Sequence, residues 1–145
     1  MNWKNEAMEK LRNYDAMVSS LINIPKEIER LRVASASIRS ARIDGDPVRG
    51  GGYRREEILM DNLMRRQELA WKLEQAQRWV ACTEKALETL TPEEALVLRR
   101  MYIYPEKGCL ERLCSELGVE QSSIYRKRDK ALYRFTIALY GGTES

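Results

Sequence analysis

Apolar residues recur at alternating spacings of four and three in the first part of the chain, which is the pattern of a coiled-coil seam. They are Ala7, Leu11, Tyr14, Val18 and Leu21, followed after a proline by Ile28, Leu31 and Ile38. Pro25 has no N–H and disfavours helical geometry at the residue before it, and Asn23 can adopt the left-handed conformation that ends a helix. We therefore predict two helices between residues 2 and 42 with a break near Asn23, in preference to one helix kinked at Pro25.

Residues 43–53 are predicted to form a loop, because Pro47 and the three consecutive glycines Gly50–Gly52 cannot propagate a helix. The segment lacks the Gly-Lys-Ser/Thr sequence and the preceding strand of a phosphate-binding loop. Its aspartates, Asp44 and Asp46, are too few for a calcium-binding loop. Basic side chains at Arg49, Arg54 and Arg55 leave a contact with nucleic acid open, but a connection within a helical hairpin is favoured.

The four-three alternation resumes in residues 54–90, which predicts one long helix. Its apolar positions are Leu59, Leu63 and Met64 in the first half, then Leu69, Leu73, Ala76, Val80, Thr83, Leu87 and Leu90. We expect residues 1–90 to form an antiparallel helical hairpin. Because an isolated helical pair buries little apolar surface, we also expect a homo-oligomer assembled through this arm. Trp71 and Trp79 are candidates for the hairpin core or, if exposed, for the surface between copies.

A separate domain is predicted over residues 91–140, followed by a short tail over residues 141–145. Thr91 is a predicted N-cap, Pro92 the first helical residue, and Glu94 the partner in a capping box. The helix that begins here is expected to end before Pro105. Gly141 and its neighbouring glycine are a stop signal for the last helix of the domain.

Residues 110–132 have the pattern of a helix-turn-helix. The first helix has an apolar inner face made by Leu110, Leu113 and Leu117, with the small Cys114 where a second helix would cross. Gly118 suits the turn because glycine tolerates a positive φ. Val119 is expected to fill the corner, and the inner face of the second helix is expected to carry Ile124, Ala131 and Phe135. Lys127 stands where an apolar residue is usual, so its aliphatic stem should pack while its ammonium reaches water.

The second helix is rich in cations: Arg126, Lys127, Arg128, Lys130 and Arg134 stand against Asp129 alone. Helical spacing places Ser122, Arg126, Asp129 and Tyr133 outward, with Tyr125 and Lys130 beside them. Gln and Arg make bidentate contacts to base edges, so a helix that begins with Gln, Ser, Tyr and Arg suits the major groove. The candidate base-reading residues are Gln121, Ser122, Tyr125 and Arg126, and the candidate phosphate contacts are Ser123, Arg128, Lys130 and Arg134. The alternative is a basic, solvated face of an ordinary helical bundle.

The amino-acid composition favours one fold class but does not decide the function. The 145 residues are 43% hydrophobic and 32% charged with a single Phe, which favours an all-α fold: a helical hairpin followed by a helix-turn-helix domain. The net charge of +3 is only mildly basic, so local clustering must carry any argument for DNA. The chain has no apolar run of about 18 residues, as a membrane span needs, and no signal peptide, so a cytoplasmic protein is expected.

The reactive side chains argue against an enzyme. Cys82, Cys109 and Cys114 contain no Cys-x-x-Cys pair, and the chain has no histidine to complete a zinc site or to act as a general base. Three thiols in a reducing compartment are the favoured interpretation. We expect no cofactor, no metal and no catalytic residue.

Residues 90–139 resemble the C-terminal domain of bacterial sigma factors, which reads promoter elements. The matching residues are the Leu-Thr-Pro-Glu-Glu sequence at 90–94, Leu98, Met101, Gly108, Leu113, Leu117, Gly118, Val119 and Lys130-Ala131-Leu132. The chain as a whole resembles phage-encoded transcriptional regulators of the RinA and ArpU type, which control late genes in phages and prophages of Gram-positive bacteria. The resemblance implies double-stranded DNA as the partner and base reading by Gln121, Ser122, Tyr125 and Arg126. Lys127 and Cys109 depart from the pattern, and nothing corresponds to the region that melts promoter DNA.

Two other binding functions fit the same organisation. A small terminase subunit also joins a helix-turn-helix to an oligomerising coiled coil, and a ring of eight or more copies would favour it. A helical protein that binds host RNA polymerase or a sigma factor would have little DNA affinity of its own. A sequence-specific DNA-binding regulator of transcription is the favoured hypothesis.

Overall fold

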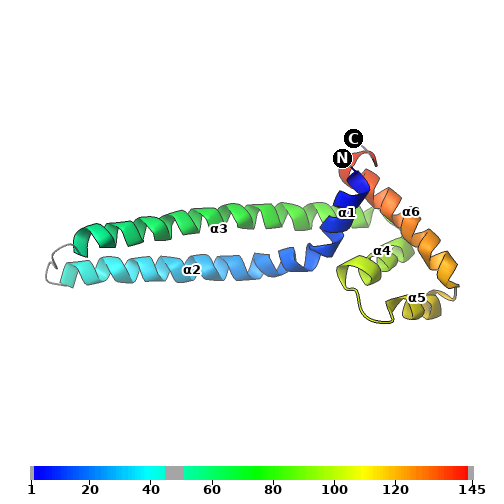
Figure 1. The fold of residues 1–145 in the computed structure, drawn as a ribbon, viewed down its shortest axis with the longest axis horizontal. Coiled ribbons are helices and arrows are strands. Elements are labelled where there is room, and N and C mark those ends of the chain that lie inside the picture. The colour runs from blue at the N-terminus through cyan, green and yellow to red at the C-terminus, as the bar shows by residue number, and fades with distance from the viewer. Residues whose placement is uncertain (1, 45–50, 144–145) are drawn as a thin grey trace. The chain divides into compact units, whose positions relative to one another are not determined.

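The computed structural model describes residues 2–44 and 51–143 and confirms the all-α fold class, since these residues contain helices and no strand (Figure 1). Side chains are described for residues 2–40 and 54–143. The elements are α1 (Trp3–Arg12), α2 (Tyr14–Asp44), α3 (Gly51–Glu88), α4 (Pro92–Leu98), the π-helical segment η1 (Arg99–Ile103), α5 (Cys109–Leu117) and α6 (Gln121–Tyr140). In the described part of the chain, no helix is long and apolar enough to cross a membrane.

The chain divides into two compact units that differ from the predicted boundary at residue 90. One unit comprises Met1–Val18 and Arg78–Ser145, and the other is Ser19–Gln77. The start and the end of the predicted arm thus pack with the C-terminal helices. α1 contacts α6 and η1, Trp3 stacks on Tyr140 with ring centroids 4.6 Å apart, and Trp79 Nε1 donates to the Lys10 carbonyl at 3.0 Å. The four-three spacing of apolar residues in the sequence identifies the apolar face of a helix. It does not show which neighbouring helix that face contacts.

The break in the first helical segment lies at Asn13, so the predicted break near Asn23 is wrong. α1 ends at Arg12, and the Asn13 backbone N–H and side-chain Nδ2 both donate to the Glu9 carbonyl, at 3.0 and 2.9 Å. These bonds satisfy a carbonyl of the last turn, where helical partners run out. α2 continues through Pro25. Pro25 is exposed, so water can bind the carbonyl that the missing N–H leaves without a partner.

Helical structure extends into both ends of the predicted loop over residues 43–53. α2 extends through Asp44, and α3 begins at Gly51, so five residues expected in the loop are helical. Glycine is tolerated at a helix start because the first N–H groups have no intrahelical partner in any case. Arg49, and with it the question whether this loop contacts nucleic acid, lies outside the described residues.

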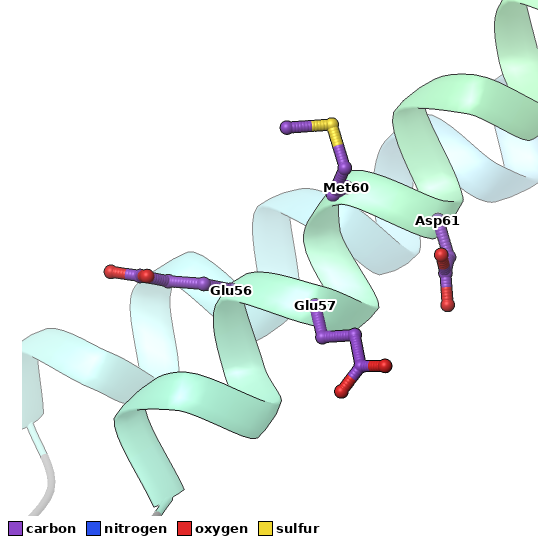
Figure 2. Close-up of a pocket in the computed structure, with 4 residues that line it drawn as sticks. All are labelled: Glu56, Glu57, Met60 and Asp61. Atoms are coloured by element: carbon purple, nitrogen blue, oxygen red, sulfur yellow. The ribbon is translucent and has the colours of Figure 1, made fainter.

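Within Ser19–Gln77, α2 and α3 lie side by side, and Asn62 Nδ2 donates to the Leu31 carbonyl at 2.8 Å (Figure 1). Leu69 and Ala76 are buried, as predicted. Leu63 and Met64 are exposed, so their predicted place in the seam is wrong. The half-buried positions beside Leu59 are polar, namely Asn62 and Arg66. The outward side of this part of α3 carries Glu56, Glu57, Met60 and Asp61 (Figure 2).

The C-terminal helices begin as the sequence predicts. The Thr91 side chain accepts from the Glu94 N–H, the Glu94 side chain accepts from the Thr91 N–H, and Pro92 opens α4, which confirms the capping box. η1 continues α4 to Ile103, where the Tyr104 N–H donates to the Arg99 carbonyl at 2.8 Å. The helical segment thus ends before Pro105, as predicted.

Tyr14 links the first turn of α2 to α3 in the larger unit. Its hydroxyl donates to Glu84 Oε1 at 2.6 Å, and the side chain is buried. Burial, together with the hydrogen bond to the Glu84 carboxylate, raises the pKa of Tyr14 from 10.0 to about 12. Because the folded state holds this proton more tightly than the unfolded state, Tyr14 contributes stability below pH 10 that is lost as pH rises toward 12.

The Tyr14→Phe variant should therefore differ from wild type in its alkaline behaviour. Wild type has a stability component that disappears between pH 10 and about 12, and the variant lacks it. The measurement is the urea midpoint of both proteins across this pH range. The exposed Tyr133 offers a matched control, since Tyr133→Phe should leave the alkaline profile of wild type unchanged. Parallel profiles for wild type and Tyr14→Phe would contradict this assignment.

Candidate nucleic-acid interface

The turn between α5 and α6 has the predicted left-handed glycine. Gly118 ends α5 with φ 65° and ψ 37°, and the Val119 N–H donates to the Cys114 carbonyl at 3.1 Å. A side chain at this φ would be strained, which explains the glycine. After this turn α6 begins at Gln121 and packs against α5.

A small apolar core holds the two helices against α4. Val97, Leu113 and Ile124 are fully buried in it, and Leu96, Met101, Leu110, Cys114, Leu117 and Val119 pack against it. The inner-face residues predicted for the first helix and Ile124 of the second therefore lie in or against this core, and the small Cys114 packs against it as well. Further along α6, Ala131 and Phe135 are also fully buried, as predicted. Helical periodicity then decides which side chains of α6 face outward.

All four candidate base-reading residues are exposed. Gln121, Ser122, Tyr125 and Arg126 occupy positions one, two, five and six of α6, so they share one side of its first two turns. Arg126 Nε donates to the Ser122 carbonyl at 3.4 Å. Further along the helix, Lys130, Asp129 and Tyr133 are also exposed, whereas Ser123 is half-buried.

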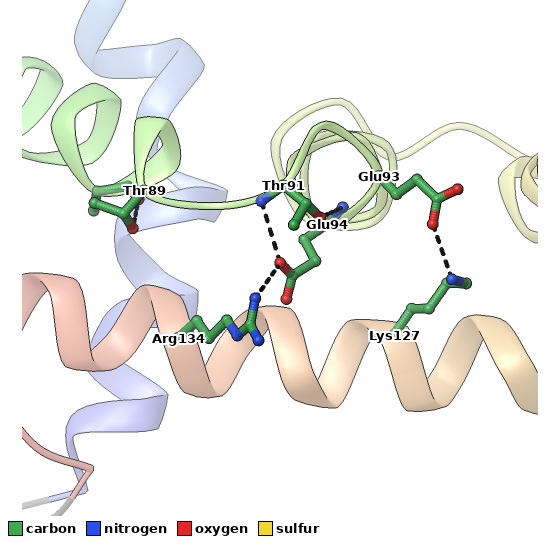
Figure 3. A network of polar contacts seen from close by, with 7 residues as sticks. Thr89, Thr91, Glu93, Glu94, Lys127 and Arg134 are labelled. Carbon is green, nitrogen blue, oxygen red and sulfur yellow. Dashed lines mark hydrogen bonds and ion pairs between the residues drawn. The ribbon is translucent and has the colours of Figure 1, made fainter.

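Two of the α6 cations are paired with acids of α4 (Figure 3). Lys127 Nζ lies 2.9 Å from Glu93 Oε2, and Arg134 Nη1 lies 2.9 Å from Glu94 Oε1. The Lys127 side chain is 31% exposed, so its stem packs as predicted, although its ammonium binds a carboxylate rather than water alone. Arg134, a candidate phosphate contact, already donates to a carboxylate. The sequence offered no sign of either pair, because the partners are 34 and 40 residues apart.

A third cation of α6 is held by its own helix. Arg128 Nη2 lies 2.9 Å from Asp129 Oδ1, and its guanidinium lies over the Tyr125 ring at 5.0 Å from the centroid. This contact stiffens Tyr125 and covers one face of its ring. Within the described part of the chain, Arg126 and Lys130 are the α6 cations that have no acidic partner.

Glu94 joins the start of α4 to α6. Its side chain is 8% exposed, and Oε1 accepts from both the Thr91 N–H, at 3.2 Å, and the Arg134 guanidinium. Burial raises the pKa of Glu94, but the hydrogen bonds from Thr91 and the charge of Arg134 outweigh it, so the pKa lies below its ordinary value of 4.5. Oε2 is buried without a partner. The carboxylate is thus ionised at neutral pH and keeps α4 and α6 in register.

A second surface feature is a hollow of about 530 Å³ beside η1 and α5. It is lined by Leu96, Arg99, Arg100, Tyr104, Glu106, Arg112 and Glu116. Arg100 pairs with Glu116 at 3.1 Å and Arg112 pairs with Glu106 at 2.8 Å. Since these pairs satisfy most of its charges, the hollow offers less to an anion than its three arginines suggest.

The cysteines do not approach a metal-binding arrangement in the described part of the chain. Cys82 is exposed, Cys109 and Cys114 are half-buried, and all three are free thiols. No group of three or more potential ligands among the described side chains is placed to hold a metal ion.

Comparison with known proteins gives no match: neither a family model, nor a curated protein, nor a solved structure is significantly similar to this chain.

The Glu94→Gln variant should lose stability and part of its acid sensitivity. The amide cannot match a carboxylate as acceptor for Thr91 and Arg134, which costs about 1–3 kcal/mol near neutral pH. Because the folded-state pKa of Glu94 lies below 4.5, its contribution is present above that pH and is lost as pH falls through the lower value. Urea denaturation should therefore show the two proteins converging in acid.

The matched control is Glu93→Gln, which removes the neighbouring carboxylate and its ion pair with Lys127. Glu93 is 58% exposed, so its loss should have a much smaller effect. Equal destabilisation by both substitutions would contradict the role assigned to Glu94.

Proposed function

We propose that this protein binds double-stranded DNA in a sequence-specific manner and regulates transcription, with the start of α6 in the major groove. The observation that supports this most is the joint exposure of Gln121, Ser122, Tyr125 and Arg126 on one side of α6. These side chains follow a left-handed turn at Gly118 and stand opposite a buried apolar face. A helix with this presentation fits a groove about 12 Å wide.

Each base-reading residue has a chemical role in the proposal. Gln121 and Arg126 can each make two hydrogen bonds to one base, to adenine and guanine respectively. Ser122 can donate or accept, and Tyr125 offers a hydroxyl and an apolar ring. The Arg128 contact with Tyr125 orders this side chain before DNA arrives, which lowers the entropy lost on binding.

The ion pairs within the protein determine how readily each candidate phosphate contact can bind a phosphate. Lys130 is exposed and lacks an acidic partner among the described residues, so it can neutralise a phosphate without first breaking a contact. Ser123 and Arg128 contribute in the proposal, Arg128 after exchanging Asp129 for a phosphate. Arg134 contributes least, since releasing it from Glu94 would leave a buried carboxylate without its cation.

The proposal includes two copies of the chain acting together. A single recognition helix reads few base pairs, and helix-turn-helix proteins extend their sites by presenting two helices about one DNA turn apart. Self-association through the α2–α3 part of the chain would supply the second helix. The resemblance to regulators of the RinA and ArpU type supports late-gene control in a phage or prophage as the biological setting.

Arg126→Ala and Lys130→Ala should separate base reading from phosphate binding. Arg126→Ala should cost about 1–3 kcal/mol on the preferred sequence and reduce discrimination against random DNA. Lys130→Ala should weaken binding to all sequences and reduce the slope of log K against log salt concentration by about one. Fluorescence anisotropy with a sequence selected from a random pool, repeated at several salt concentrations, measures both effects.

The matched control is Lys4→Ala, which also removes one positive charge. Lys4 follows Trp3, which stacks on Tyr140 at the end of α6, about 21 Å along the helix from Arg126. Its loss should leave both affinity and salt slope close to wild type. The proposal fails if Arg126→Ala weakens specific and random DNA equally, or if neither α6 variant differs from Lys4→Ala.

A further inference from the structure

The outward side of α3 carries an exposed stripe with coiled-coil spacing. Met60, Met64, Gln67 and Trp71 follow one another at intervals of four, three and four residues, and Leu63 and Ala70 widen the stripe on one side. All six residues are exposed, with Trp71 at 60% and Met64 at 59%. We call these six residues the outer stripe. Its spacing is that of a helix prepared to pack against another helix.

The seam between α2 and α3 does not account for the apolar content of this unit. Among the side chains described between Ser19 and Gln77, the buried ones are Ser35, Leu69 and Ala76. The same unit exposes seven larger apolar side chains: Ile22, Val33, Ile58, Met60, Leu63, Met64 and Trp71. A helical pair with so small a core gains little from burial, and contiguous exposed apolar residues mark an interaction surface.

The charges beside the outer stripe indicate what can cover it. Glu56, Glu57 and Asp61 surround Met60 (Figure 2). Glu68 lies one turn before Trp71 on α3. It pairs with Arg65 and Lys72, at 3.2 and 3.4 Å. The border is acidic around Met60, whereas the acid near Trp71 is paired with two cations. The acidic part repels both DNA and the anionic headgroups of a membrane, which recruit helices with basic borders. The border therefore favours a protein helix as the partner.

From this we infer that the outer stripe is the interface between two copies of the chain, packed α3 against α3. Both helices of the Ser19–Gln77 unit already face each other, so neither covers the outer stripe within that unit. A second copy brings a helix with the same spacing and length, and contacts between identical surfaces close into a symmetric pair. The inference rests on the self-association included in the proposed function and assigns it a surface.

The size of the outer stripe sets the expected strength of the pair. From Met60 to Trp71 the helix rises about 17 Å, which is three turns. Six side chains from each copy make an interface at the small end of the usual size range. We therefore expect a dissociation constant on the order of micromolar. Trp71 contributes most, because tryptophan is among the residues that carry most of the binding energy of protein interfaces.

Light scattering after gel filtration of the full chain, without DNA, tests the inference. At a protein concentration about 100 times the expected dissociation constant, wild type should have close to twice the monomer mass of 16.9 kDa. Trp71→Glu should run as a monomer with unchanged helical circular dichroism. Val33→Glu is the matched control, because Val33 has nearly the same exposure, 57%, but lies on α2. It should keep the mass of wild type.

A photo-cross-linking amino acid at position 67 provides a measurement that does not depend on a disruptive substitution. In a mixture of ¹⁴N- and ¹⁵N-labelled protein, it should form mixed-isotope cross-links to the stretch of α3 around the other copy's outer stripe. A monomeric wild type, an unchanged mass for Trp71→Glu, or cross-links that fall outside α3 would each overturn the inference.

The two proposals fail in different ways. Arg126→Ala should keep the dimer mass, and Trp71→Glu should keep the base preference of a single α6 at reduced affinity. A dimer that binds no DNA would overturn the proposed function alone. A DNA-binding monomer would overturn the α3 interface and the pairing of two copies, but not sequence-specific binding by α6.

Discussion

The direction that α6 presents to solvent depends on the packing of Ile124 against Val97 and Leu113. These three side chains are fully buried and come from three different helices, so they set both the position of α6 and its rotation about its own axis. A rotation by one residue would turn the helix by about 100° and bury a polar side chain in place of Ile124. Core packing therefore selects the polar side chains that stand outside.

Ion pairs then reduce the number of cations that remain for a ligand. Lys127 and Arg134 contact α4, and Arg128 contacts Asp129 and Tyr125. These contacts stabilise the arrangement of helices more than they prepare an anion-binding surface, most clearly at Glu94, whose buried carboxylate needs its cation. The basic helix of the sequence is a mixed surface in the structure, with Arg126 and Lys130 as its unpaired cations among the described residues.

The long helix α3 has different surfaces on its two sides. Toward α2 it offers a seam in which the polar Asn62 and Arg66 precede the apolar Leu69 and Ala76, and the Asn62 amide donates to a carbonyl of α2. Polar residues in a seam cost stability but restrict register. The larger apolar side chains, Trp71 among them, lie on the other side. This distribution is what a helix needs if its strongest contacts are made after folding.

The sequence alone determined the all-α class, the capping box at Thr91, the glycine turn at Gly118 and the inner face of the last helix, because each depends on residues within one or two helical turns. Only the tertiary structure decided the break at Asn13, the exposure of Met64, and the return of α1 to the C-terminal helices. Apolar residues at the same spacing can serve any neighbouring helix, so their periodicity leaves the partner undetermined. The ion pair between Arg134 and Glu94 likewise could not be predicted. The sequence gives the sign of each charge, but only the tertiary structure shows which charges lie close together.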